Sequence, residues 1–124
     1  MNKTAKILLV NDEKDILEIL SRRLIAENYE VVKAYNGVEC LKILKGYRPD
    51  LILVDLNMPK MNGFETIRVI RQRIKWHIPI IVVTATDSDT ESTRQCLDSG
   101  ADGCICVPCE KEELLTKIRE MTMK

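Results

Sequence analysis

Residues 51–63 read LILVDLNMPKMNG: four aliphatic residues lead to one carboxylate, Asp55, and then to a segment rich in turn-forming residues. A strand that is covered on both faces has a continuous run of aliphatic side chains. Where such strands end, a parallel sheet opens the crevice in which it binds ligands. The stretch therefore predicts a buried strand that presents Asp55 at this edge of the sheet.

Further short apolar runs predict the other strands of the sheet. They cover residues 7–10, 29–34, 78–83 and 104–107. Between the runs, apolar residues recur at three- and four-residue spacing, as in Leu17, Leu20 and Leu24, which is typical of amphipathic helices. Five strands that alternate with five helices predict an α/β fold, a doubly wound parallel sheet with right-handed connections. Only the run at 29–34 is interrupted by polar residues, so we expect it to be an edge strand.

Length, composition and charge limit the classes of function. The 124 residues include 45% hydrophobic and 31% charged side chains, which is typical of one globular domain. Nineteen basic and nineteen acidic side chains leave no net charge, so we expect no direct binding of nucleic acid. The apolar runs are far shorter than a membrane span, and five cysteines, an odd number, argue for reduced thiols. We therefore expect a cytoplasmic protein that does not bind membranes.

The order Asp-x-Asn-Met-Pro-x-Met-x-Gly in residues 55–63 resembles the phosphoacceptor segment of response-regulator receiver domains, the CheY-like domains of two-component signalling. The resemblance extends from Lys6 to about Met121. It implies the flavodoxin-like (βα)5 fold with strand order 2-1-3-4-5. It also implies that Asp55 accepts a phosphoryl group, in a phosphorelay, from a histidine kinase or a phosphotransfer protein.

The resemblance also sets expectations for organisation and partners. We expect residues 1–124 to form a single receiver domain, with no output domain in this chain. Such a domain is a signalling protein rather than an enzyme, although it assists its own phosphorylation. It would control a partner protein or domain, which the sequence does not identify, through the face formed by the fourth helix, the fifth strand and the fifth helix.

Oxygen ligands gather at one edge of the predicted sheet. Strands one and three are neighbours in this strand order, so Asp12, which follows the first strand, should lie close to Asp55. Two adjacent carboxylates repel each other, and a hard cation such as Mg2+ relieves that repulsion. By resemblance, Asp12 and Asp55 bind Mg2+ through their carboxylates and Asn57 through its backbone carbonyl, while the hydroxyl of Thr84 contacts the phosphoryl group.

Each of these residues also has a simpler explanation when it is taken alone. Asp12 could serve only as a helix cap, because an aspartate after a strand is commonly one. Asn57 could belong only to a turn, and Thr84 could make only a local backbone hydrogen bond. The combination of carboxylates after two strands and a hydroxyl after a third favours the receiver site.

Three positions depart from the family pattern. Asn11 stands where receivers carry the first of two acids, Val107 where they carry a lysine, and Cys104 where they carry an aromatic residue that moves during activation. Val107 removes a positive charge and its directed hydrogen bonds, whereas Asn11 removes a negative charge, so the two changes offset in net charge. We therefore expect the pocket to bind Mg2+ but to transfer or retain a phosphoryl group differently. Cys104 is too small to act as the moving aromatic side chain.

Two alternatives stay open for the function. The first is a degenerate receiver that binds its partner without phosphorylation, because the lysine is missing. The second is a thiol redox sensor, since Cys106 and Cys109 form a Cys-x-x-Cys pair at a predicted junction of strand and helix, where a helix N-terminus favours the thiolate. A thioredoxin-type dithiol requires its own fold, however, and free cysteines are also ordinary core residues.

Overall fold

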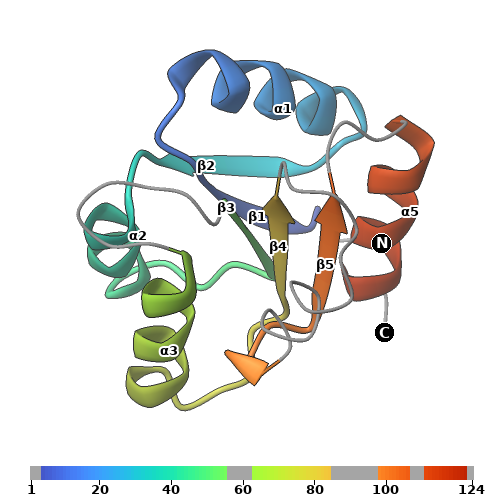
Figure 1. Cartoon of the computed structure of the whole chain (residues 1–124). Coiled ribbons are helices and arrows are strands. Elements are labelled where there is room, and N and C mark those ends of the chain that lie inside the picture. Colours follow the sequence, from blue (N-terminus) through green and yellow to red (C-terminus); the bar gives the residue numbers. More distant parts are fainter. Residues whose placement is uncertain (1–3, 56–62, 85–97, 107–110, 123–124) are drawn as a thin grey trace.

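A parallel sheet of five strands forms the centre of the computed structural model, and helices cover both of its faces (Figure 1). The structure describes residues 4–55, 63–84, 98–106 and 111–122. The strand order is β2-β1-β3-β4-β5, and all neighbouring strands are parallel. The predicted α/β fold and strand order are therefore confirmed, and β2 is an edge strand as expected.

Strands and helices alternate along the chain. Their bounds are β1 Lys6–Val10, α1 Lys14–Ala26, β2 Glu30–Ala34, α2 Gly37–Leu44, β3 Leu51–Asp55, α3 Gly63–Arg73, β4 Ile80–Thr84, β5 Gly103–Cys106 and α5 Lys111–Thr122. The predicted fourth helix falls in residues 85–97, outside the described residues. Among the helices that are described, none is long and apolar enough to cross a membrane.

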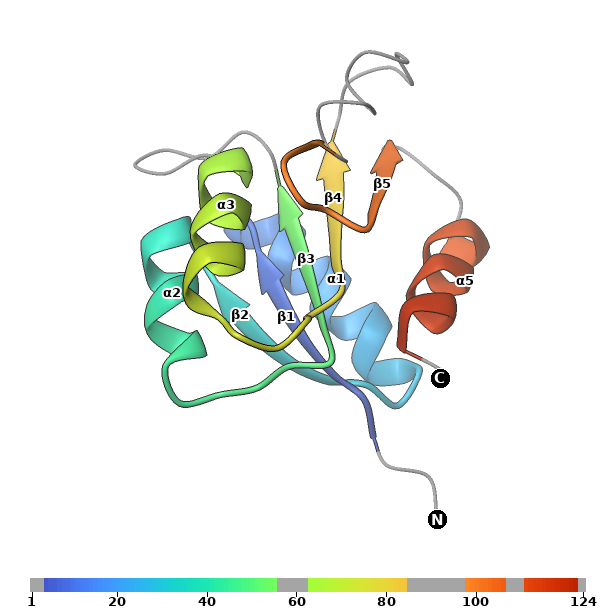
Figure 2. The same cartoon turned by 90° about the horizontal axis from the view of Figure 1, so that it is seen from below.

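The sheet separates two apolar cores because successive side chains of a strand point to opposite faces. On one face, Leu8 and Ile52 pack with the buried residues of α2 and α3. On the other face, Ile7 and Leu53 pack with the buried residues of α1 and α5. Figure 2 shows these two helix pairs on opposite sides of the sheet. The central strands β1 and β3 are covered on both faces, as their continuous aliphatic runs predict.

The fourth strand begins two residues later than the run at 78–83 predicts. Pro79 has no N–H group with which to continue a strand ladder, although its carbonyl accepts a hydrogen bond from the Ile52 N–H at 3.0 Å. The carbonyl of Ile78 instead accepts a hydrogen bond from Arg71 at 2.7 Å. Ile78 is nevertheless buried in the core, which explains its aliphatic side chain.

Arg71 of α3 joins three segments at the edge of the sheet opposite to Asp55. Besides Ile78, it donates to the carbonyl of Gly100 at 2.9 Å and to the carboxylate of Asp102 at 2.8 Å. Gly100 has φ +109°, and a Cβ atom there would lie 3.1 Å from Arg71 Cγ. Glycine therefore permits both the backbone conformation and the close approach of the arginine.

Asp102 completes this cluster from the segment before β5. Its carboxylate accepts a hydrogen bond from the Ile80 N–H at 2.8 Å and lies 2.9 Å from His77 Nε2. The Asp102 N–H in turn donates to the Ile80 carbonyl at 2.8 Å. These contacts hold the beginning of β4 against the segment that leads into β5.

We predict that Arg71→Met lowers the free energy of unfolding by about 2 kcal/mol, because it removes a largely buried donor from Asp102 and from two carbonyls. Urea denaturation followed by circular dichroism measures this change. The matched control is Arg68→Met, an exposed position on the same helix, which should change stability by less than about 0.5 kcal/mol. Equal effects of the two substitutions would contradict the role given to Arg71.

Candidate functional site

The ends of β1 and β3 bring two carboxylates to the same edge of the sheet. Val10, the last residue of β1, pairs with Val54 of β3. Asp55 is the next residue along β3, while Asn11 and Asp12 follow Val10 along the chain. The sequence-predicted proximity of these two segments therefore follows from the observed register.

The ends of β4 and β5 complete this edge. Asp55 pairs with Val83, so Thr84 is one residue further along β4, and Thr84 pairs with Cys106 at the end of β5. The backbone of Thr84 thus lies at the same edge of the sheet as Asp55. The predicted site residues Asn57, Val107 and Cys109 lie outside the described residues.

Asn11 shapes the turn that follows β1. Its N–H donates to the Ala34 carbonyl at 3.1 Å, and its Oδ1 accepts a hydrogen bond from the Glu13 N–H at 2.9 Å. Only 8% of Asn11 is exposed. A hydrogen bond from the side chain of residue i to the N–H of residue i+2 is the Asx turn that asparagine favours. Sequence reasoning treated Asn11 only as a lost acid and missed this role, although the preference of asparagine for turns is a readable signal.

The turn leaves Asp12 exposed and clear of the helix that follows. The N-cap residue of α1 is Glu13, which makes no side-chain capping hydrogen bond. The explanation of Asp12 as a helix cap is therefore wrong. Across residues 4–55, 63–84, 98–106 and 111–122, the Asp12 carboxylate has no hydrogen-bond or ion-pair partner. Its charge remains available at the edge of the sheet.

The donor atoms at this edge fit a hard cation. Asp12 supplies an exposed carboxylate and Asp55 a half-buried one. In the described residues, no group of three or more histidine, cysteine, aspartate or glutamate side chains could hold a metal ion. Asp12 and Asp55 could supply two carboxylate ligands to a cation here, and water oxygens could complete its shell. That combination of few protein ligands and several waters suits Mg2+ and does not suit a structural zinc site.

The cysteines of the described part differ in their surroundings. Cys40 of α2 is completely buried, and burial raises the pKa of its thiol to about 12. Cys104 of β5 is half-buried. Cys40 is therefore a core residue. The Cys106–Cys109 pair is untested, because Cys109 lies outside the described residues.

Comparisons with known proteins agree with this architecture. The family model of the response regulator receiver domain matches residues 7–119. Response regulator MprA of Mycobacterium ulcerans (strain Agy99) is 37% identical over 118 residues, which are 95% of this chain and 50% of MprA. The chain thus spans about half the length of the curated relatives that it matches.

Solved structures show the same fold. The chemotaxis response regulator CheY4 of Vibrio cholerae has a TM-score of 0.89 and 32% identity, over 96% of this chain and 99% of CheY4. The receiver domain of a sensor histidine kinase from Pseudomonas aeruginosa PAO1, solved with a magnesium ion in its active site cleft, has a TM-score of 0.88 and 24% identity. That match covers 98% of this chain and the whole of the other.

We predict that Cys40 resists thiol reagents in the folded chain. The rise in its pKa from 9.0 to about 12 reduces the thiolate fraction at pH 8 about 1,000-fold. Isotope-coded alkylation followed by peptide mass spectrometry should show slow labelling of Cys40 and faster labelling of Cys104, with equal rates in denaturant. Rapid labelling of Cys40 in the folded chain would contradict the assignment.

The same burial has a consequence for stability. The folded-state pKa of Cys40 lies above its unfolded-state pKa. The contribution of Cys40 to the free energy of unfolding is therefore complete below pH 9.0 and decreases as the pH rises toward about 12. The free energy of unfolding of a Cys40→Ala variant, compared with that of the parent chain across this pH range, should not show this decrease.

Proposed function

The chain belongs to the response regulator receiver domain family, and on this premise we propose that it accepts a phosphoryl group on Asp55 in a Mg2+-dependent reaction. Receiver domains are signalling domains of two-component systems rather than classical enzymes. The donor would be a histidine kinase or a phosphotransfer protein, and residues 1–124 would act as a single receiver domain. The observation that carries this proposal is the β1–β3 register, which brings Asp12 and Asp55 to one edge.

The proposed metal ligands are the carboxylates of Asp12 and Asp55 and the backbone carbonyl of Asn57. Mg2+ bound there would supply positive charge that offsets the negative oxygens of the phosphoryl group. The exposed Asp12 carboxylate, the turn held by Asn11 and the half-buried position of Asp55 support this assignment. A magnesium ion also occupies the active site cleft of the Pseudomonas aeruginosa receiver domain that shares this fold.

Asp55 is the proposed nucleophile. A carboxylate oxygen attacks the phosphorus atom of a phosphohistidine, and an O–P bond forms as the P–N bond breaks. The imidazole nitrogen leaves with the electron pair of that bond and takes a proton from solvent. The hydroxyl of Thr84 is proposed to contact the transferred group, which agrees with the place of Thr84 one residue beyond Asp55 in the neighbouring strand.

The departures from the family pattern favour one competing proposal. Val107 lacks the ammonium group that would hold a phosphoryl oxygen, and a neutral Asn11 offsets the charge but does not replace that contact. A receiver of this kind could bind its partner without phosphorylation. The thiol sensor formed by Cys106 and Cys109 is the other competitor, and no observation in the described residues favours it.

We predict a single phosphoryl adduct when the chain is incubated with Mg2+ and a small-molecule phosphoryl donor under reducing conditions. Rapid intact-mass analysis detects it. The adduct should disappear in Asp55→Asn and without Mg2+, and it should persist in Asp15→Asn, an exposed acid in the first turn of α1. If a lysine-containing receiver is labelled in parallel and this chain is not, the phosphorylation-independent module replaces the proposal.

We further predict that Asp12→Asn weakens Mg2+ binding tenfold or more, because even residues that only orient metal ligands change affinity by about 10- to 100-fold. Titration followed by amide NMR measures this affinity, with the signals of Asn11, Glu13 and Asp55 as reporters. The Asp15→Asn variant should bind Mg2+ as the parent chain does. Unchanged affinity in Asp12→Asn would remove Asp12 from the ligand set.

A further inference from the structure

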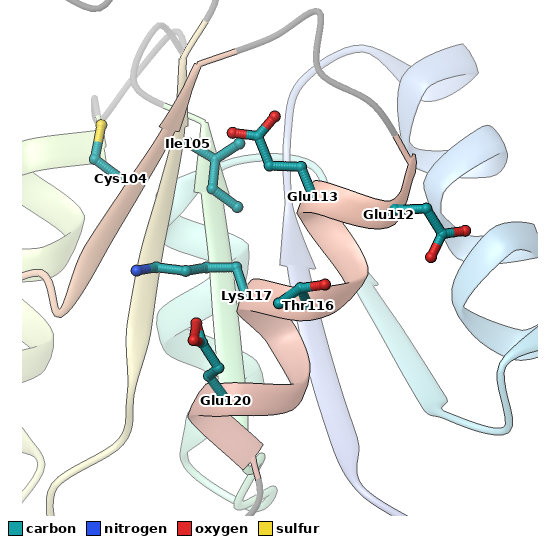
Figure 3. A pocket seen from close by; sticks show the side chains of 7 residues that line it. All are labelled: Cys104, Ile105, Glu112, Glu113, Thr116, Lys117 and Glu120. Atoms are coloured by element: carbon teal, nitrogen blue, oxygen red, sulfur yellow. The ribbon is translucent and has the colours of Figure 1, made fainter.

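Lys117 of α5 reaches toward the last strand of the sheet, but not toward the end of it that lies near Asp55 (Figure 3). A Cβ atom on Gly103 would lie 3.1 Å from Lys117 Cε, so the stem of Lys117 lies over Gly103. Gly103 begins β5, and Cys106 ends it, about 10 Å further along at 3.3 Å per residue. Lys117 therefore does not take the place of the lysine that Val107 replaces.

Lys14, the first residue of α1, is turned toward the other side of the sheet. Its Nζ lies 5.9 Å from the centroid of the Tyr35 ring. Tyr35 follows the edge strand β2, and β1 separates β2 from β3. The ammonium group of Lys14 thus lies on the β2 side, two strands away from Asp55.

Asn11 is closer, because it stands beside Asp55 in the neighbouring strand. The last residue pair of β1 and β3 is Val10 with Val54, so the next residues along the two strands, Asn11 and Asp55, are neighbours. The hydrogen bond from the Asn11 N–H to the Ala34 carbonyl extends the β1–β2 ladder by this one residue. Asn11 therefore continues the geometry of β1.

The side chains of Asn11 and Asp55 lie on the same face of the sheet. Val10 and Val54 both belong to the core on the α2–α3 face. Successive side chains of a strand alternate between the faces, so the next pair points to the side of α1 and α5. The two side chains therefore emerge next to each other at the edge of the sheet.

The orientation of the Asn11 amide is fixed by the turn. Its Oδ1 accepts the Glu13 N–H at 2.9 Å, and an N–H can donate only to the oxygen of the amide, so Nδ2 points away from the turn. In the described residues Nδ2 has no hydrogen-bond partner, although only 8% of Asn11 is exposed. Among the same residues, Trp76 Nε1 is the only completely buried side-chain nitrogen or oxygen without a partner, so solvent still reaches Asn11 Nδ2. The amide is thus a free donor that a bound anion can reach.

We propose that the Asn11 side-chain amide donates a hydrogen bond to an oxygen of the phosphoryl group on Asp55. The amide keeps both of its protons, and it approaches from β1, whereas Val107 follows β5 in sequence. The contact is therefore an additional, neutral one and does not restore the charged contact of the lysine. An ionised aspartate, the residue type of the family pattern at this position, has no proton to donate, so the contact depends on the departure at Asn11. The inference rests on the proposed function and adds a phosphoryl-binding residue to the same site.

Beryllofluoride with Mg2+ tests this contact without phosphoryl transfer, because beryllium binds a carboxylate oxygen and its three fluorines take the places of the phosphoryl oxygens. The reagent is titrated into the isotope-labelled full chain, and the side-chain NH2 signals of the asparagines are followed by NMR. The Asn11 NH2 signals should shift from their positions with Mg2+ alone, and those of Asn36, the N-cap of α2, should not. Unshifted Asn11 NH2 signals when Asp55 is saturated would overturn the proposal.

Serine substitutions separate the donor from the turn. Asn11→Ser keeps a neutral side chain whose oxygen can accept the Glu13 N–H, because serine forms turns of the same kind, but it lacks the amide donor. It should weaken beryllofluoride binding about tenfold, as expected for the loss of a hydrogen bond to a charged group, and leave the Mg2+ affinity unchanged. The matched control, Asn36→Ser, keeps the helix cap and should change neither affinity. Equal weakening of both affinities by Asn11→Ser, or unchanged beryllofluoride binding, would overturn the proposal.

The parent chain distinguishes this inference from the proposed function. Beryllofluoride binding that shifts the Asn11 signals, in a chain that forms no adduct with a small-molecule phosphoryl donor, would support the contact and contradict only the proposed phosphorylation. A phosphoryl adduct that leaves the Asn11 signals unshifted would contradict only the contact. A chain that forms no adduct and binds no beryllofluoride would contradict both.

Discussion

The parallel pairing of β1 with β3 determines where the proposed phosphoacceptor site of this chain lies. Both strands are aliphatic on both faces, so the alternation of side chains alone specifies their register weakly. Reciprocal hydrogen bonds at the start of the two strands fix it: the Asp50 N–H donates to the Lys6 carbonyl at 2.7 Å, and the Lys6 N–H donates to the Asp50 carboxylate at 2.8 Å. Asp12 and Asp55 then leave the other end of the pair at the same edge of the sheet.

The sequence was sufficient to predict the order of strands and helices, since aliphatic runs and three-to-four spacing reflect burial directly. It was less accurate where a contact distant in sequence decides a boundary. The run at 78–83 is uniformly apolar apart from Pro79, yet the strand begins at Ile80, because the Ile78 carbonyl accepts a hydrogen bond from Arg71. No local pattern contains the position of that arginine.

The candidate site was predictable in its residue types and not in its local geometry. A single Asp12 is as compatible with a helix cap as with a metal ligand, and only the position of the N-cap at Glu13 separates the two. Asn11 has a structural role in the turn as well as an electrostatic one.

The proposed function requires that Asp12 and Asp55 form one cation site, on which phosphoryl acceptance depends. The most direct test is a crystal structure of the chain soaked in Mn2+, an ion that shares the oxygen ligands and octahedral geometry of Mg2+ and can be located by its anomalous scattering. We expect one strong anomalous peak between the carboxylates of Asp12 and Asp55. A fully occupied Mn2+ at another position, or no peak between these carboxylates in a crystal that leaves the edge of the sheet open to solvent, would contradict it.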